Sequence, residues 1–180
     1  MRVFFAIEFN EEVKERLFFI QQELRKYCNG GNYSYKENFH LTLRFIGDQT
    51  PEQIQKLVEA LRNTAEGTAG FGLTIDRLGD FNKGSRKIIW AGIERSSELQ
   101  HLYCKLEGAL GEIGYPREQK AYSPHVTLIR ETRLENSTEG FNSIGFGKIQ
   151  TQVGAISLME SKRVDNRLTY SAISRIDLLG

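Results

Sequence analysis

Two tripeptides of the same type, His-x-Thr, carry the side chains best suited to chemistry in this chain. The first begins at His40 in the stretch NFHLTLRFIG, and the second begins at His125 in SPHVTLIRE. Both stretches have the composition of β-strands, in which residues i and i+2 point to the same face. His40 would therefore share a face with Thr42, and His125 with Thr127. Each strand then offers an imidazole next to a hydroxyl.

Two imidazoles and two hydroxyls suit displacement at phosphorus. The unperturbed pKa of histidine is roughly 6.5, so one neutral imidazole can accept a proton while a second, charged one donates. One would take the proton of an attacking water or hydroxyl, and the other would protonate the leaving oxygen. The hydroxyls of Thr42 and Thr127 can hydrogen-bond to the non-bridging oxygens. A metal site needs at least three close His, Cys or carboxylate ligands, and no such pattern is evident, so we expect neither metal nor cofactor.

Each of these residues also has a structural interpretation. A single histidine on a strand is usually a structural residue, and Thr42 and Thr127 could serve only as strand formers. His101 lies in a predicted helix among polar residues, so we expect it to be solvated. We expect five aromatic residues in the core, although one near a cleft could stack a terminal base: Phe4, Phe5, Phe45, Trp90 and Tyr122. We expect five cations to form mostly a solvated face, with RNA backbone binding as the alternative: Arg86, Lys87, Lys162, Arg163 and Arg167.

Helix and strand signals around the motifs alternate along the chain. Asn10 before two glutamates indicates a helix start, as does Thr50 followed by Pro51 and Gln53. Three helices are predicted, at 11–27, 51–66 and 97–111. Strands are predicted at 2–9, 38–46, 71–79, 86–94, 121–130, 144–150, 153–162 and 168–176. Turns are predicted at 82–84 and 165–166, and the polar stretch 131–140 is compatible with a helical turn or a loop.

This order of elements predicts an α+β fold. The two histidines lie nearly half a chain apart, and a helix precedes each histidine strand. We therefore expect two pseudo-symmetric lobes of antiparallel sheet with outer helices and an active-site cleft between them. Residues 1–180 would form a single bilobal domain with one motif per lobe, at about 38–46 and 121–130.

The composition is that of an ordinary globular protein. Of the 180 residues, 39% are hydrophobic and 26% charged, and the net charge of +1 argues against a broad nucleic-acid-coating surface. Cys28 and Cys104 are far apart, which favours a reducing compartment. The apolar start of the chain is too short for a signal peptide or membrane span. We expect a cytoplasmic monomer without membrane contact.

The paired motifs, about half a chain apart in a protein of this size, resemble those of the 2H phosphoesterase superfamily. Further stretches narrow the resemblance to the bacterial and archaeal RNA 2′,3′-cyclic phosphodiesterases, once called 2′-5′ RNA ligases. These stretches are RVFFAIEF, NFHLTLRFIG, KIIWAGI, SPHVTLIR, and LMESKR followed by a strand containing Tyr170. The similarity spans nearly the whole chain.

The resemblance implies hydrolysis of a terminal 2′,3′-cyclic phosphate on RNA to a 2′-phosphate, and in some members a reversible 2′-5′ ligation. It implies that His40 donates a proton to the leaving oxygen and His125 accepts one from water, although the residues alone leave these roles interchangeable. Thr42 and Thr127 would bind the phosphate. The partners would be RNA 3′ ends or small cyclic nucleotides.

Arg130 follows the second motif, five positions after His125, where the first motif has Phe45. In the resembling enzymes an arginine here often lies near the phosphate, and a guanidinium fits an anion well. Because five is odd, a regular strand would point Arg130 away from His125. Arg130 reaches the cleft only if the strand ends or bulges between the two.

Three function classes remain open from the sequence. The first is a metal-free cyclic phosphodiesterase, whose substrate could also be another small cyclic nucleotide or a 2′-5′ linked oligonucleotide. The second is a module that binds RNA ends or nucleotide phosphates without turnover. The third is a metal-dependent hydrolase with His40 and His125 as ligands.

Overall fold

The computed structural model describes residues 1–134, 144–145 and 147–180. Its helices are α1 (Glu11–Leu24), α2 (Pro51–Ala65) and α3 (Ser97–Glu112), with short 3-10 helices η1 (Arg25–Tyr27) and η2 (Lys36–Asn38). Its strands are β1 (Arg2–Glu8), β2 (Cys28–Asn29), β3 (Asn32–Tyr33), β4 (His40–Asp48), β5 (Phe71–Lys83), β6 (Arg86–Ile93), β7 (His125–Leu134), β8 (Ile149–Val153), β9 (Ala155–Val164) and β10 (Arg167–Asp177). No helix in this described part of the chain is long and apolar enough to cross a membrane.

Helix starts follow the capping signals in the sequence. The Asn10 side chain accepts a hydrogen bond from Val13 N at 3.0 Å, and Thr50 forms a reciprocal capping box with Gln53. Ser96 caps α3 in the same way, at 3.1 Å from Leu99 N. These caps satisfy N–H groups that the first helical turn leaves unpaired. The predicted helices at 11–27, 51–66 and 97–111 are confirmed to within a few residues, the end of the first being the 3-10 turn η1.

The strands form two antiparallel sheets, which confirms the predicted fold class. The first sheet has the order β10-β9-β1-β4, and the second has β2-β7-β6-β5-β8, with β3 also pairing with β7. The last two strands of the chain thus complete the sheet that begins with β1. The sheets are therefore not successive halves of the sequence, even though each contains one histidine strand.

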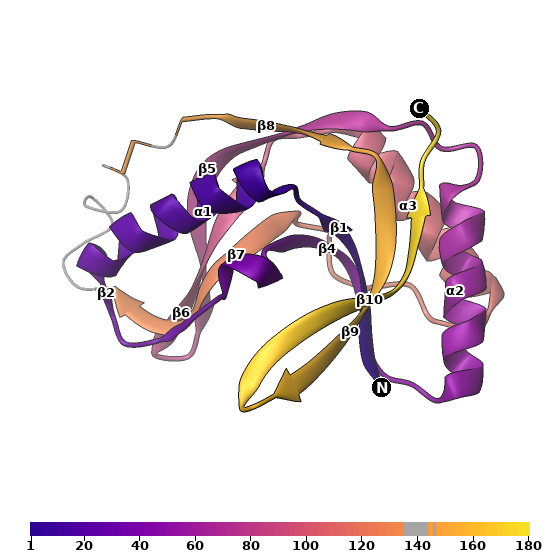
Figure 1. Ribbon diagram of the computed structural model, residues 1–180, viewed down its shortest axis with the longest axis horizontal. Helices are drawn as coiled ribbons and strands as arrows, with labels where there is room; N and C mark the ends of the chain where they lie inside the picture. Colours follow the sequence, from indigo (N-terminus) through magenta and orange to yellow (C-terminus); the bar gives the residue numbers. More distant parts are fainter. Residues whose placement is uncertain (135–143, 146) are drawn as a thin grey trace.

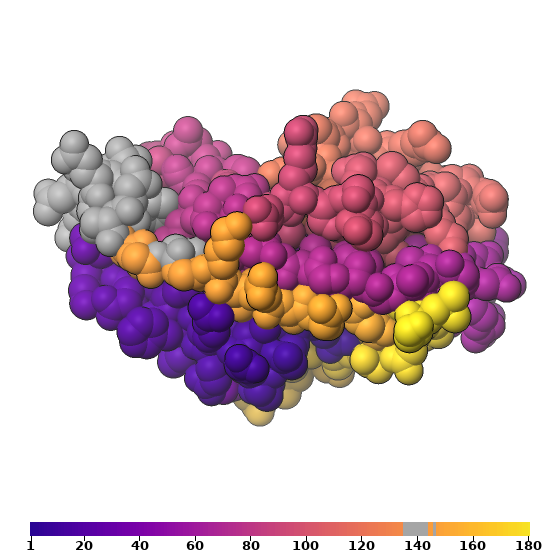
Figure 2. Space-filling view, turned by 90° about the horizontal axis from the view of Figure 1, so that it is seen from above, coloured from indigo at the N-terminus to yellow at the C-terminus, as the bar shows by residue number. Residues whose placement is uncertain are grey.

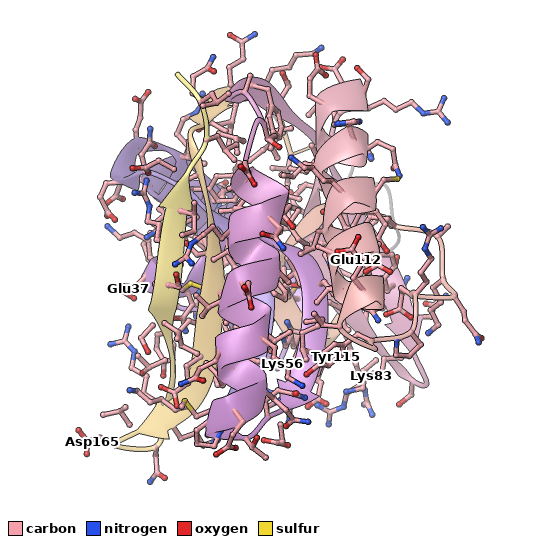
Figure 3. The ribbon with its side chains drawn as sticks, turned by 90° about the vertical axis from the view of Figure 1, so that its right-hand side faces the viewer. Glu37, Lys56, Lys83, Glu112, Tyr115 and Asp165 are labelled. Carbon is pink, nitrogen blue, oxygen red and sulfur yellow. The ribbon has the colours of Figure 1, made fainter. Side chains whose placement is uncertain are left out.

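The helices cover the outer faces of these sheets. Figure 1 shows α1 along one side and α2 with α3 at the other end, while the β9–β10 hairpin projects from the body. α1 contacts β7 and β8, whereas α2 contacts β9, β10 and α3. Figure 2 shows β8, in orange, as a strip between the indigo N-terminal residues and the magenta residues that follow α2. α2 and α3 lie side by side in Figure 3.

Apolar side chains from both sheets and all three helices form one continuous core. Its fully enclosed members include Phe5, Leu17, Leu41, Leu57, Ile75, Ile89, Leu106, Val126 and Leu158. Arg44 on β4 is a charged addition at its edge, where it lies 3.3 Å from the buried Glu107 of α3 and 2.6 Å from Glu118. The Arg44–Glu107 pair thus connects β4 with α3 at this edge of the core.

Several predicted strand limits were wrong. β7 begins at His125, not near 121, and continues to Leu134, so the start of the undecided stretch 131–140 is strand. The rest of that stretch lies outside the described residues. The strand predicted at 144–150 is β8 at Ile149–Val153, and β5 extends to Lys83, which moves the hairpin turn to Gly84. The turn at Asp165 and Asn166 is confirmed, with positive φ at both residues.

Candidate active site

The two histidine strands meet between the sheets. β4 is the last strand in the order of its sheet, and it contacts β7 of the other sheet. His40 is the first residue of β4, and His125 is the first residue of β7. Both side chains, with Thr42 and Thr127, line one hollow of about 690 Å³, which we call the two-histidine cleft. The structure therefore brings together four residues that the sequence predicted to act as a unit.

His40 is held by its own strand and by aromatic rings. Its Nδ1 lies 2.7 Å from the carbonyl oxygen of Asn38, and its Nε2 lies 3.0 Å from Thr42 Oγ1. A carbonyl oxygen only accepts, so Nδ1 carries the hydrogen, and Nε2, which accepts from the Thr42 hydroxyl, is the nitrogen that can exchange a proton. The rings of Phe4 and Tyr170 lie 4.8 Å and 5.1 Å from the imidazole centre.

His125 repeats this arrangement. Its Nδ1 lies 2.7 Å from the carbonyl oxygen of Ser123, again two residues earlier, so its Nε2 is likewise left for proton transfer. Its aromatic neighbours are Phe81 and Trp90, with ring centres 5.0 Å and 6.0 Å away. The backbone before each strand therefore selects the same tautomer in both histidines.

Burial lowers the pKa of both imidazoles. Burial is the main cause that brings the pKa of His40 down to about 4, and the charges of Arg130 and His125 lower it further. The Asn38 carbonyl and Glu8 oppose this shift. Burial also lowers the pKa of His125, helped by Arg130 and opposed by the Ser123 carbonyl. Burial in the cleft thus favours two neutral imidazoles at neutral pH.

Each histidine strand bulges at the third residue after its histidine. On β4, Phe45 and Arg44 pair with successive residues of β1, but the next paired residue is Thr42, so Leu43 is skipped. On β7, Ile129 and Thr127 pair with successive residues of β6, so Leu128 is skipped. A bulge of this kind reverses the alternation of side chains beyond it.

The bulges turn the fifth residue after each histidine toward the cleft. Arg130 and Phe45 both line the two-histidine cleft with His40 and His125. The condition for Arg130 to reach the cleft, a bulge between it and His125, is therefore met. The expectation that Phe45 lies in the core was wrong, because the bulge leaves it 49% exposed, with the guanidinium of Arg2 4.9 Å from its ring centre.

The other aromatic residues expected in the core are at least partly buried. Phe4 and Phe5 are buried as expected, and Trp90 and Tyr122 are partly buried.

A residue of α1 that the sequence analysis did not single out supports the bulge of β7. Gln21 is 1% exposed, and its Nε2 donates at 2.8 Å to the carbonyl oxygens of Leu128 and Ser34. Ser34 N also donates to the Leu128 carbonyl at 2.9 Å. The carbonyl at the bulge, which the β-ladder leaves unpaired, is thus satisfied twice. A glutamine on the apolar stripe of α1 was the available sequence signal.

Trp90 was expected in the core, and it packs beside Phe81 and His125. A Cβ at Gly79 would overlap its indole ring, and a Cβ at Gly92 would come within 2.8 Å of it. The two glycines therefore form a flat slot across neighbouring strands, and the ring in this slot faces Phe81 and His125. Glycines inside strands signal such close approaches.

The two-histidine cleft is electrically positive. Arg2, Arg130, Lys162 and Arg163 line it, and among the described residues no carboxylate does. Of the other candidates, His101 is exposed on α3 as expected, and Arg86, Lys87 and Arg167 do not line this cleft. The described residues contain no group of three or more His, Cys, Asp or Glu side chains placed to hold a metal ion.

This arrangement is that of an anion-binding cleft with two groups able to exchange protons, and comparison with known proteins defines the family. A model of the 2′-5′ RNA ligase superfamily matches residues 12–165. The chain is 32% identical over 163 residues to the RNA 2′,3′-cyclic phosphodiesterase of Thermotoga maritima, covering 89% of this chain and 87% of that one. It is 24% identical to the enzyme of the same name from Methanocaldococcus jannaschii, covering 96% and 98%.

Solved structures agree with this assignment. E. coli LigT complexed with 3′-AMP superimposes with a TM-score of 0.78 at 25% identity, over 98% of this chain and 97% of that chain. A Thermus thermophilus protein has a TM-score of 0.82 at 24% identity, over 100% and 99%. The chain belongs to the 2′-5′ RNA ligase superfamily, which confirms the resemblance found in the sequence.

Proposed function

We propose that this protein hydrolyses the 2′,3′-cyclic phosphate at an RNA 3′ end to a 2′-phosphomonoester, without a metal or cofactor. The observation that carries the proposal is the pair of imidazoles in one positive cleft, each with Nδ1 on a carbonyl and Nε2 available. The relatives named RNA 2′,3′-cyclic phosphodiesterase, similar over most of the chain, support the choice of substrate.

In this mechanism His125 Nε2 takes a proton from water as the water oxygen forms a bond to phosphorus. The bond from phosphorus to the 3′-oxygen breaks on the opposite side, and His40 Nε2 donates a proton to that oxygen. The hydroxyls of Thr42 and Thr127 and the Arg130 guanidinium bind the non-bridging oxygens, where negative charge accumulates. An RNA 5′-hydroxyl in place of water would give 2′-5′ ligation by the same steps.

Because the pKa of His40 is low, we expect its imidazole to gain the catalytic proton only when substrate binds. A bound phosphate places negative charge next to the imidazole and offsets the charges of Arg130 and His125, so the pKa of His40 rises. The protein would therefore take up a proton as it binds substrate, and the acid would be charged only when an anion is present. Phe45 supports the choice of a nucleotide, because its exposed ring offers a face to the terminal base.

The test is hydrolysis of an oligonucleotide that ends in a 2′,3′-cyclic phosphate, in excess chelator. We expect a 2′-phosphate product, and we expect His125→Ala to lose most of the activity. His101→Ala, which removes an exposed histidine of α3, is the matched control and should retain full activity. Binding without turnover would support an RNA-end binding module, and loss of wild-type activity in chelator would support a metal-dependent hydrolase.

A further inference from the structure

A second hollow opens beside the two-histidine cleft, on the side of His40. We call it the side groove; its volume is about 440 Å³, in the range of ligand pockets. His125 does not line it, but seven residues line both hollows: His40, Thr42, Thr127, Arg130, Arg163, Leu168 and Tyr170. Its own walls are the segment that follows β2 and the turn of the β9–β10 hairpin, which contribute Asn32, Ser34, Tyr35, Asn38 and Asn166. Figure 1 shows that hairpin projecting from the body, and Figure 3 labels Asp165 at its tip.

The wall of the side groove presents a stacking surface. Tyr35 is 44% exposed, and the guanidinium of Arg167, which lines the neighbouring hollow, lies 3.9 Å from the centre of its ring and helps to hold the ring in place. Unpaired bases stack on tyrosine rings and on guanidinium planes, and such stacking tolerates any base. Beside this pair, Ser34 and the amide groups of Asn32 and Asn166 offer polar groups without net charge.

The charge of the side groove also favours a polyanion. Arg130 and Arg163 line it, and no carboxylate among the described residues does. Arg163 donates a hydrogen bond to the Asn166 carbonyl at 3.1 Å, which holds it at the hairpin turn. Arg163 lines both hollows, and the hydrolysis proposed above assigns it no function, because Arg130 and the threonines already bind the cyclic phosphate.

The geometry of a terminal nucleotide explains why two hollows would meet at His40. A ribose carries its base on one carbon and its link to the preceding nucleotide on another, so the two leave the sugar in different directions. If the base lies on Phe45 in the two-histidine cleft, the 5′ chain must leave by another route. The side groove begins where His40 would meet the 3′-oxygen of that ribose.

We propose that the side groove binds the single-stranded RNA segment just before the terminal nucleotide, with Tyr35 stacking its base and Arg163 binding its phosphate. This inference rests on the proposed function and adds the substrate class: an oligonucleotide end is preferred to a mononucleotide. We expect the preference for a longer RNA to end after this segment. In the next hollow, past Tyr35, Lys36 and Arg167 are already paired with Glu15 and Glu37, and the Arg25 guanidinium lies over the ring of Tyr33, so further phosphates gain little.

The test compares a trinucleotide that ends in a cyclic phosphate with a mononucleoside 2′,3′-cyclic phosphate. We expect wild-type kcat/KM to be about tenfold higher for the trinucleotide, and this ratio to fall about fivefold in Arg163→Gln and in Tyr35→Ala. Tyr35→Phe, which keeps the ring, should preserve the ratio. Lys56→Gln, which removes an exposed cation of α2 that lines neither hollow, is the matched control and should also preserve it (Figure 3).

Binding to His125→Ala separates this inference from the proposed function. The trinucleotide should bind this variant about tenfold more tightly than the mononucleotide, with a steeper dependence on salt, whether or not the wild type turns either compound over. Equal affinity and equal kcat/KM for the two compounds would overturn the proposal that the side groove binds RNA, while leaving the proposed hydrolysis intact. An equal loss on both substrates in Arg163→Gln would also overturn it, because Arg163 would then act on the cyclic phosphate. No turnover of either compound, with the binding preference present, would overturn only the proposed function.

Discussion

The strands β4 and β7 share the same backbone course from the histidine through the bulge, and their cleft-lining residues differ at the fifth position after the histidine. In both, the histidine bonds through Nδ1 to a carbonyl two residues earlier, a threonine follows two residues later, and a bulge follows the threonine. The bulge then turns a fifth residue into the cleft, which is Phe45 on β4 and Arg130 on β7. The same kind of bulge thus presents an aromatic ring to the cleft from β4 and a positive charge from β7.

This difference indicates how a nearly symmetric frame can bind an unsymmetric substrate. A nucleotide phosphate is charged at one end and aromatic at the other. Guanidinium groups fit the first and aromatic rings the second. We therefore expect exchange or removal of the two fifth residues to have effects of different kinds.

The largest effect is expected at Arg130. Arg130→Met removes a charged donor from the cleft while keeping a long side chain, and we expect kcat/KM to fall about 100-fold or more, mainly through kcat. Steady-state kinetics on a cyclic-phosphate oligonucleotide measures this. Arg133→Met, an exposed arginine three residues further along β7, is the control. A loss of kcat/KM that came only from a higher KM would show that Arg130 binds the ground and transition states equally, which would contradict its assigned role.

A smaller effect of the other kind is expected at Phe45. Phe45→Ala removes the exposed ring, and we expect KM to rise about tenfold with little change in kcat, since stacking holds the ground and transition states equally. Phe45→Tyr should keep the wild-type KM. If Phe45→Ala instead lowered kcat as strongly as Arg130→Met, the assignment of base stacking to Phe45 and charge stabilisation to Arg130 would be wrong.

The bulge itself is tested from α1. Gln21→Leu deletes one of the two hydrogen bonds to the Leu128 carbonyl, so we expect the aim of Arg130 to loosen and kcat/KM to fall about fivefold. Gln100→Leu, an exposed glutamine on α3, is the control. Combining Gln21→Leu with Arg130→Met should cost no more activity than Arg130→Met alone, because both changes act through one side chain. Additive losses would contradict this coupling.

The sequence predicted the fold class and the meeting of His40 with His125, because caps, apolar patterning and repeated motifs are local signals. It could not predict on which side Phe45 and Arg130 lie. Alternation is a rule for regular strands, and the bulges depend on partners elsewhere, such as Gln21 and Ser34. On β7 the adjacent apolar residues Leu128 and Ile129 were a local sign that the alternation breaks, and both are buried in the structure. Phe45 failed as a core prediction for the same reason.

A last prediction concerns stability, not activity, and tests whether the folded protein holds His40 neutral. Its pKa is about 4 in the folded protein and roughly 6.5 when unfolded, so the unfolded chain binds more protons between these values. The free energy of unfolding should therefore rise with pH across this window, by up to about 3 kcal/mol from this group. Urea unfolding at pH 4.5 and pH 7 should show a smaller difference for His40→Asn than for the wild type. An identical difference would mean that His40 is not held neutral.

The division of labour between the two imidazoles is tested most directly with a cyclic phosphate in which sulfur replaces the 3′-oxygen. A thiolate leaves without protonation, so the substrate removes the need for an acid and keeps the need for a base. We predict that His40→Ala, nearly inactive on the natural substrate, hydrolyses the sulfur compound at close to the wild-type rate, while His125→Ala stays inactive on both. Rescue of His125→Ala instead, or rescue of neither variant, would contradict the account.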